Sequence, residues 1–295
     1  MKVLTLGSGF VADHLPYDKI HERVALDWRH IGFLLNTYQP DVLVNCIGKT
    51  GRPNVDWCEN NREETSAANT ALPIMLADAC AKRKIRLIQL GSGCIYFGPS
   101  PHLSYGMYCG PDPSYVGHGT NPDPGWREDD FANPKSYYSK SKYACDLVLG
   151  QMDHVTTLRL RMPVSEKDNP RNLINKLRGY NQVINIHNSM TFMTDLVRCI
   201  EWAVQGDVSG IFHVTNPQPL TAARIMKEYQ KYVPEHQFEL ITENQLDQMT
   251  VAKRSNCILS TEKLHRAGFD LTDSEEALEI CMANYVKNMR ANDVK

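Results

Sequence analysis

The first twelve residues, M-K-V-L-T-L-G-S-G-F-V-A (residues 1–12), place a short apolar run directly before two closely spaced glycines. Residues 2–6 have the composition of a buried strand, and Gly7-x-Gly9-x-x-Ala12 has the spacing of a phosphate-binding turn. Gly7 permits the turn, Gly9 lets the backbone approach a pyrophosphate, and Ala12 lets a helix pack closely, with the phosphates over its N-terminus. Because the motif follows a strand, it favours a dinucleotide-binding α/β fold over a purely structural turn.

Strand-like and helix-like segments alternate through the first two-thirds of the chain. Strands are predicted at residues 2–6, 24–26, 42–45, 85–90 and 156–160, and helices at residues 31–38, 63–83 and 136–151. This alternation indicates a parallel sheet with helices on both faces. We therefore predict a Rossmann-type doubly wound parallel sheet in residues 1–165 and a smaller C-terminal substrate-binding domain in residues 166–295. A helical pattern over residues 190–204 predicts that residues 186–206 return to the first domain.

The composition excludes several classes of protein. Lys and Arg number 32 against 34 Asp and Glu, a net charge of -2, so we expect neither a nucleic acid nor an anionic membrane as partner. The nine cysteines lack C-x-x-C or regular spacing, which argues against a disulfide framework or a metal site and fits a reducing compartment. No apolar run approaches the roughly 20 residues of a membrane span, and no signal peptide precedes the first strand. We expect a cytoplasmic protein.

A tyrosine and a lysine suited to proton transfer lie on one predicted helix. Tyr138 and Lys142 are four residues apart, so both side chains face the same side of that helix. A phenol ionises near pH 10, and an ammonium one turn away would stabilise the phenolate. Ser92, at the end of the strand predicted at residues 85–90, supplies a second hydroxyl. A solvated helix face can show this spacing by chance, but the glycine turn and Ser92 together favour a site that holds a carbonyl oxygen during hydride transfer.

The residues that would distinguish NAD from NADP are ambiguous. The strand predicted at residues 24–26 is followed by Asp27, which would favour a free ribose 2′-hydroxyl. Arg29 lies two residues later and would accept a 2′-phosphate. The residues therefore favour neither cofactor.

The chain resembles the extended short-chain dehydrogenase/reductases, whose marks are the glycine loop, a serine or threonine four residues before a tyrosine (Ser92 before Tyr96) and Y-x-x-x-K. Five further blocks are similar to the plant-type UDP-4-keto-6-deoxyglucose 3,5-epimerase/4-reductases: G-R-P-N-V-D-W-C-E, R-L-R-M-P, N-P-R-N-L-I-N-K, N-S-M-T and K-R-S-N. Bacterial dTDP-4-dehydrorhamnose reductases are more distantly similar, in residues 254–264. The resemblance implies a bifunctional enzyme that converts UDP-4-keto-6-deoxy-D-glucose to UDP-L-rhamnose with NADPH, with NADH as the alternative cofactor.

A cysteine two residues after Ser92 fits the epimerase half of that activity. A 4-ketone acidifies the C–H bonds at C3 and C5, and inversion needs proton exchange on both faces of the sugar. Cys94 lies on the same strand face as Ser92, and a thiol can exchange a proton near neutral pH; a small packed cysteine is the alternative. S-x-C-I-Y is similar to GDP-fucose synthase, whose cysteine is assigned to epimerisation. That enzyme's histidine has no counterpart here, where Asn172 stands, and the plant-type resemblance implies Lys176 instead.

The remaining expected contacts form two groups. For the cofactor we expect Gly7, Ser8, Gly9, Phe10, Val11, Arg29, Asn45, Gly48, Tyr138 and Lys142. For the substrate we expect Lys49, Thr50, Arg52, Asn54, Asn172, Arg254 and Asn256. Asp56 would orient the sugar or cap the next helix. Residues 98–128, with six prolines and six glycines, are predicted to form a substrate-side loop.

Two other functions compete with the bifunctional enzyme. A dTDP-4-dehydrorhamnose reductase without epimerase activity would have no need of Cys94. A non-catalytic dinucleotide-binding regulatory subunit would have no need of Ser92, Tyr138 and Lys142 together. A homodimer is compatible with any of the three.

Overall fold

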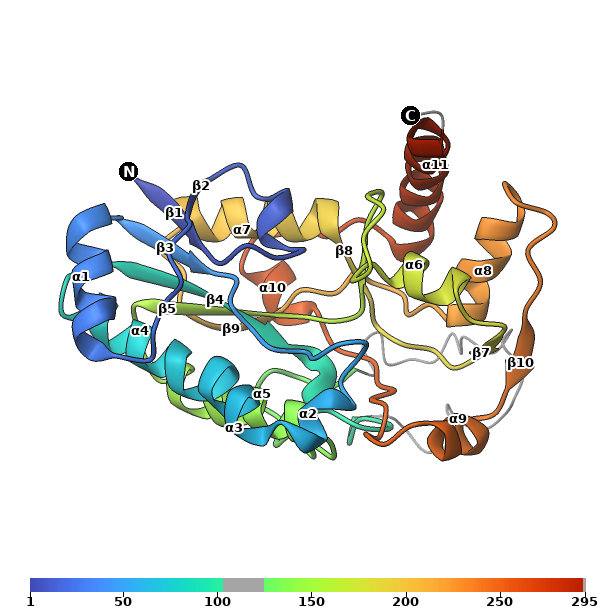
Figure 1. Ribbon diagram of the computed structural model, residues 1–295, viewed down its shortest axis with the longest axis horizontal. Helices are drawn as coiled ribbons and strands as arrows, with labels where there is room; N and C mark the ends of the chain where they lie inside the picture. The colour runs from blue at the N-terminus through green and yellow to red at the C-terminus, as the bar shows by residue number, and fades with distance from the viewer. Residues whose placement is uncertain (103–124, 294–295) are drawn as a thin grey trace.

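A six-stranded parallel sheet forms the centre of the computed structural model, which describes residues 1–102 and 125–293. The strand order is β2-β1-β3-β4-β5-β9 (Figure 1). The bounds are β1 Val3–Leu6, β2 Asp18–Ile20, β3 Val42–Asn45, β4 Arg86–Ser92, β5 Val155–Leu160 and β9 Gly210–His213. The predicted α/β Rossmann-type sheet is therefore confirmed. Most of the predicted substrate-side loop, residues 103–124, lies outside the described residues.

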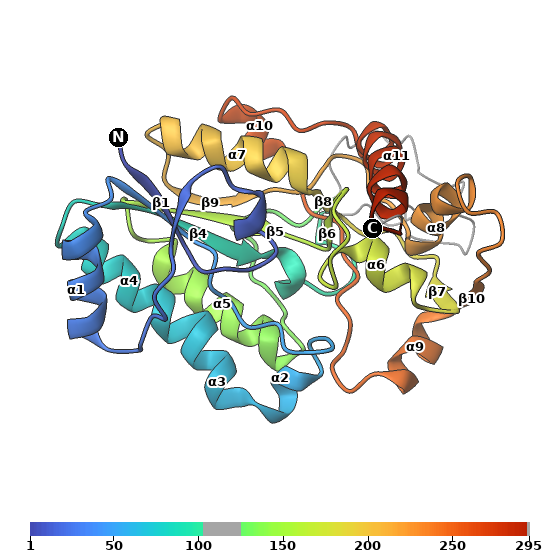
Figure 2. The same ribbon diagram turned by 45° about the horizontal axis from the view of Figure 1, so that its top comes forward.

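Helices cover both faces of this sheet because its strands are apolar on both faces. One face packs against α1 (Trp28–Tyr38), α4 (Leu72–Ala81) and α5 (Tyr137–Leu149), and the other against α7 (Met193–Gln205) and α10 (Glu262–Arg266) (Figure 2). Within β3, Leu43 belongs to the first core, whereas Val42 and Val44 belong to the second. The alternation along β3 thus divides the core into two layers.

The first crossover departs from the prediction. The helix expected after the glycine turn is only a three-residue 3-10 turn, η1 (Ala12–His14). Pro16 explains the early stop, because a proline restricts the residue before it, and Leu15 is extended. The shortened crossover brings the second strand forward to Asp18–Ile20, so the strand predicted at residues 24–26 is wrong.

A second layer of helices and short strands lies beside the carboxyl edge of the sheet (Figure 1). It contains β6 (Pro163–Val164), α6 (Leu173–Arg178), β7 (Gln182–Ile184), β8 (Thr191–Phe192), α8 (Ala222–Gln230), β10 (Glu239–Ile241), α9 (Glu243–Met249) and α11 (Ser274–Asp293). The chain leaves this layer at α7, adds β9 to the main sheet, and then returns. Within residues 1–102 and 125–293, no helix is both long and apolar enough to cross a membrane.

Candidate active site

The carboxyl end of β4 turns sharply and places a thiol beside a hydroxyl. Ser92 is the last residue of β4 and caps the 3-10 turn η3 (Gly93–Ile95), where its Oγ accepts a hydrogen bond from the Cys94 backbone N–H at 3.2 Å. Ser92 is buried, whereas Cys94 is half-buried. Both side chains therefore belong to the edge of the sheet at which parallel α/β proteins bind ligands.

Helix α5 brings Tyr138 and Lys142 to the same edge. Burial raises the pKa of the Tyr138 phenol above its ordinary value, and a hydrogen bond with Ser92 opposes part of that rise. The Lys142 Nζ donates to the Leu90 carbonyl at 3.2 Å, and burial lowers the pKa of this ammonium. Gly48 makes room for it: a Cβ at Gly48 would lie 3.3 Å from the Lys142 Nζ. The structure thus brings Ser92, Tyr138 and Lys142 together.

Lys176 approaches the same space from the last turn of α6. Burial lowers the pKa of its ammonium, and the neighbouring Arg171 and Arg254 guanidiniums lower it further, whereas Cys94 raises it. Cys94 also acts on the pKa of Tyr138. These effects place the Cys94 thiol and the Lys176 ammonium in one site with the tyrosine.

Arg171, which the sequence reasoning missed, joins the second layer to the loop after β3. Its Nη1 donates to the Thr50 Oγ1 at 2.6 Å and to the Gly51 carbonyl at 2.7 Å. Burial lowers the pKa of Arg171, and the exposed Arg52 nearby lowers it further. Arg52, Arg171 and Lys176 therefore make this part of the site positive. The run N-P-R-N-L-I-N-K contained the signal, since arginine binds phosphate more readily than the neighbouring asparagine.

Three asparagines predicted to bind ligands are instead used by the protein itself. Asn172 is fully buried and caps α6: its amide accepts from the Ile174 N–H and donates to the Ser165 and Lys167 carbonyls. The amide of Asn45 donates to Gln89 and accepts from the Ile47 N–H. Asn256 donates to Glu243 and accepts from Asn188. Buried amides with these partners have little capacity left for a ligand, so the structure does not support these three predictions.

Three other expected substrate contacts also have partners within the protein. Arg254 forms a bidentate ion pair with Asp56 at 2.7 and 3.0 Å, which gives both residues a structural partner. The Lys49 Nζ pairs with Glu64 at 2.8 Å. The Asn54 Oδ1 accepts from the Asp56 N–H within the loop.

The cofactor predictions divide in a similar way. Gly7 has a φ of +103°, as a tight glycine turn requires, and Ser8 and Gly9 are exposed after it. Phe10 instead packs into the core, with Val11 against it. The Asp27 Oδ1 accepts from the Arg29 N–H at 2.7 Å and caps α1.

Arg29 was predicted to contact the cofactor because the second strand was expected at residues 24–26. That strand is instead β2 at Asp18–Ile20, so neither Asp27 nor Arg29 comes directly after it. The residues that do follow β2 are His21, Glu22 and Arg23, and all three are exposed. The Glu22 carboxylate accepts a hydrogen bond from the Tyr38 hydroxyl.

Asn69, another residue that sequence reasoning missed, braces the loop after β3 against the α5 helix. Its Oδ1 accepts from the Lys49 N–H at 2.8 Å, and its Nδ2 donates to the Lys49 carbonyl at 2.9 Å and the Ser141 Oγ at 3.2 Å. Asn69 is fully buried in the π-helix η2 (Ala67–Ala71), a helix type often found at functional sites. Ser141 precedes Lys142, so this brace fixes the distance between the β3 loop and the lysine.

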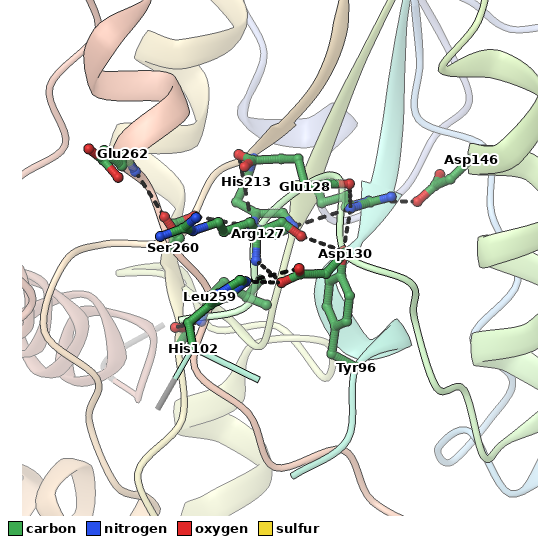
Figure 3. Close-up of polar contacts among 12 residues, drawn as sticks. Tyr96, His102, Arg127, Glu128, Asp130, Asp146, His213, Leu259, Ser260 and Glu262 are labelled. Atoms are coloured by element: carbon green, nitrogen blue, oxygen red, sulfur yellow. Dashed lines mark hydrogen bonds and ion pairs between the residues drawn. The ribbon is translucent and has the colours of Figure 1, made fainter. Parts of the chain in front are cut away.

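A buried polar network is centred on Arg159, which pairs with Asp146 one turn after Lys142 on α5. The Arg159 guanidinium donates to the Asp146 carboxylate at 2.8 Å, the Tyr96 hydroxyl at 2.8 Å and the Glu128 carbonyl at 3.2 Å (Figure 3). The His213 Nε2 lies 3.2 Å from the same guanidinium, which can only donate, so Nε2 accepts and Nδ1–H donates to the Ser260 carbonyl. Burial holds the pKa of His213 well below its ordinary value, which keeps the ring neutral.

A parallel sheet with a glycine turn after its first strand, and with serine, tyrosine and lysine at its carboxyl edge, has the features expected from the resemblance to the short-chain dehydrogenase/reductases. The profile of the RmlD substrate binding domain matches residues 21–287, and the chain belongs to this family.

Two curated relatives from Arabidopsis thaliana carry sugar-nucleotide names. The trifunctional UDP-glucose 4,6-dehydratase/UDP-4-keto-6-deoxy-D-glucose 3,5-epimerase/UDP-4-keto-L-rhamnose-reductase is 34% identical over 83% of this chain, which spans only 34% of that protein's length. The bifunctional dTDP-4-dehydrorhamnose 3,5-epimerase/dTDP-4-dehydrorhamnose reductase is also 34% identical, over 83% of this chain and 77% of that protein.

Solved structures share the fold. The L780 UDP-rhamnose synthase of Acanthamoeba polyphaga mimivirus superposes with a TM-score of 0.84 at 24% identity, over 96% of this chain and 99% of that one. The dTDP-4-dehydrorhamnose reductase of Bacillus anthracis, solved in complex with NADP, has a TM-score of 0.76 at 17% identity, over 96% and 98%.

Proposed function

We propose that this protein is an NADPH-dependent 4-keto-sugar-nucleotide reductase with 3,5-epimerase activity, which converts UDP-4-keto-6-deoxy-D-glucose to UDP-L-rhamnose. The observation that carries the proposal is the shared site of Ser92 and Tyr138, which suit a ketone, with Cys94 and Lys176, which suit proton exchange. The names of the plant relatives support the same pair of reactions.

The glycine turn after β1, at Gly7 and Gly9, leaves space for a dinucleotide beside Gly9. No atom lies within 4 Å of the position that a Cβ would take on Gly9, so a pyrophosphate can approach the backbone there. With only η1 after the turn, backbone N–H groups would bind the phosphates without a full helix behind them. Arg23 replaces Arg29 as the residue proposed to contact a 2′-phosphate. When bound, NADPH supplies the hydride that adds to C4 of the sugar.

The hydroxyl pair would perform the proton chemistry of the reduction. Because burial raises the pKa of Tyr138, the phenol carries its proton at neutral pH and can donate it to the oxygen formed at C4. Ser92 donates a second hydrogen bond to that oxygen, and the Lys142 cation stabilises the phenolate left behind.

The same pair of hydroxyls, Ser92 and Tyr138, would serve epimerisation before reduction. Proton removal at C3 or C5 moves the C–H electron pair towards the C4 oxygen, where Ser92 and Tyr138 stabilise the enolate. One of Cys94 and Lys176 takes the proton, and the other returns one to the opposite face of the carbon. The lowered pKa of Lys176 suits this role, because less energy is needed to deprotonate it. Arg52 and Arg171 would face the diphosphate.

Two alternatives remain testable within the same proposal. A reductase acting on ready-made dTDP-4-dehydrorhamnose would use the Ser92, Tyr138 and Lys142 chemistry alone. A regulatory subunit would bind the dinucleotide without turnover. A cytoplasmic location is part of the proposal, supported by the free state of all eight cysteines in the described residues. A homodimer is compatible with it.

Deuterium exchange would test both activities in one experiment. Purified protein is mixed with UDP-4-keto-6-deoxyglucose in deuterium oxide, first without and then with NADPH, while NMR follows the sugar. We expect deuterium at C3 and C5 before NADPH is added, and UDP-L-rhamnose afterwards. Cys94→Ala and Lys176→Met should each stop exchange, whereas the distant control Cys281→Ala, on α11, should not. Reduction of a pre-epimerised sugar without any exchange would leave a simple reductase.

A further inference from the structure

Two arginines two residues apart are buried to the same degree but have different surroundings. Arg159 and Arg161 have exposed fractions of 2% and 1%. The positive charge of Arg159 is balanced by the Asp146 carboxylate at 2.8 Å. Among the described residues, the hydrogen-bond partners of the Arg161 side chain contain no carboxylate, although a guanidinium keeps its charge at any pH at which a protein is folded.

Every hydrogen-bond partner that the structure describes for the Arg161 side chain is neutral when it carries its ordinary protons. Nη1 donates to the Ser255 Oγ at 3.0 Å and to the Cys94 Sγ at 3.5 Å, and Nη2 donates to the Asn188 Oδ1 and the Ser255 carbonyl. The Nε atom is buried, and the part of the chain that the structure describes offers it no hydrogen-bond partner. A buried charge held only by neutral acceptors is costly, because these acceptors replace water incompletely.

One of these partners can become an anion. A hydroxyl, an amide and a carbonyl cannot lose a proton near neutral pH, whereas a thiol can. Cys257 also lies near Arg161, but it is fully buried, its Sγ donates to the Gly93 carbonyl at 3.8 Å, and burial raises its pKa. Cys94 is half-buried and shares the site with Tyr138 and Lys176, so it is the thiol that can both balance the charge and reach a sugar.

We propose that Arg161 is a positioning residue for epimerisation, whose guanidinium holds Cys94 as a thiolate and fixes its sulfur in the site. This inference rests on the proposed function and names what prepares one of its two proton-exchanging groups. The thiolate accepts the proton from C3 or C5: an S–H bond forms, the C–H bond breaks, and its electron pair moves to the enolate held by Ser92 and Tyr138. Lys176 supplies the proton to the opposite face.

The other charges around Cys94 agree with this assignment. Lys176 is a second positively charged group near the sulfur, and Arg171 and Arg254 are its own positive neighbours. Tyr138 remains a neutral phenol because burial raises its pKa. In this proposal Cys94 carries the negative charge opposite Arg161 and Lys176.

Alkylation of the free protein tests the thiolate without any sugar. The rate at which iodoacetamide modifies Cys94 is measured from pH 5 to 10 by mass spectrometry of its peptide. We expect the rate of the unmodified protein to reach half its maximum below the roughly pH 8.5 of a free thiol. Arg161→Met should slow modification at pH 7 by about tenfold, equivalent to about 1.4 kcal/mol, and move the profile to higher pH.

Two variants separate charge from packing. Arg161→Lys keeps the charge and should retain most of the rate, whereas Ser255→Ala removes a neutral partner and should change it by less than about twofold. NADPH binding reports whether each variant is folded. If Arg161→Met does not fold, the pH profile of the unmodified protein still decides, because an ordinary thiol profile would overturn the inference.

The outcomes also separate this inference from the proposed function. If Cys94 is alkylated as a thiolate below the roughly pH 8.5 of a free thiol but no deuterium enters the sugar, the epimerase activity would be contradicted. The role of Arg161 in holding the Cys94 thiolate would still be supported. Exchange with an ordinary thiol profile, unchanged in Arg161→Met, would support the epimerase and overturn the role of Arg161.

Discussion

Removing the carboxylate of Asp146 should destabilise the protein far more than removing an exposed one. Asp146 and Arg159 each have an exposed fraction of 2%, and their ion pair measures 2.8 Å. Asp146→Asn preserves the shape of the side chain but removes the only carboxylate that accepts a hydrogen bond from Arg159 among the described residues, and leaves Glu128 as an acidic group near the guanidinium that accepts through its backbone carbonyl alone. Breaking a buried pair in this way costs about 3–5 kcal/mol, a large part of the roughly 5–15 kcal/mol by which proteins are stable.

Urea unfolding measures this loss, followed by circular dichroism. With a slope of at most about 3 kcal/mol per molar urea, a loss of 3 kcal/mol lowers the midpoint by about 1 M or more. Asp78→Asn is the matched control, because its exposed ion pair with Lys82 at 2.6 Å is worth about 1 kcal/mol at most. The double variant Asp146→Leu with Arg159→Met should lose less than Asp146→Asn, since no unpaired charge remains. Equal losses in Asp146→Asn and Asp78→Asn would refute the reasoning.

Two further predictions concern pH and cofactor choice. Burial holds the pKa of His213 below its ordinary 6.5. Below that pH the unfolded chain therefore binds a proton that the folded protein does not. The free energy of unfolding should fall as the pH decreases, by up to about 1.4 kcal/mol per pH unit. Urea unfolding at pH 7, 6 and 5 should show a shallower fall in His213→Gln, and an identical fall would contradict the assignment. Arg23→Ala should weaken NADPH binding about tenfold, through loss of a charge-assisted hydrogen bond, and leave NADH binding unchanged. Arg29→Ala is the control, and a larger effect there in fluorescence titrations would show that the wrong arginine was chosen.

Local patterns predicted most of the sheet correctly. The strand predicted at residues 42–45 matches β3, and the β1, β4 and β5 strands lie within two residues of their predicted ends. Apolar runs of this kind are reliable because burial on both faces of a parallel sheet demands them. The second strand was misplaced because its three residues, D-K-I, carry almost no apolar signal and pair only along one edge.

The candidate site was predictable where spacing along one element decides it. Tyr138 and Lys142 are such a pair, both on α5. Ser92 and Cys94 do not share one strand as expected, because β4 ends at Ser92 and Cys94 lies in the turn η3. Spacing could not say whether a polar side chain faces a ligand or the protein, as Asn172 shows by capping α6 beside Arg171. Nor could the run R-L-R-M-P show that Arg159 has a carboxylate partner, whereas Arg161 has only neutral partners among the described residues. The side-chain partners of the two arginines lie more than ten positions away, and only the folded chain brings them together.

The turn that carries Cys94 depends on residues near the end of the chain. The Ser255 Oγ donates to the Tyr96 carbonyl at 2.6 Å across 159 positions, and the Gly98 N–H donates to the Asn256 carbonyl at 2.9 Å. The main sheet is complete once His213 has been added. During synthesis the sheet can therefore form before the segment that holds this turn has left the ribosome. We expect the main sheet to form first and the turn that carries Cys94 to be fixed last.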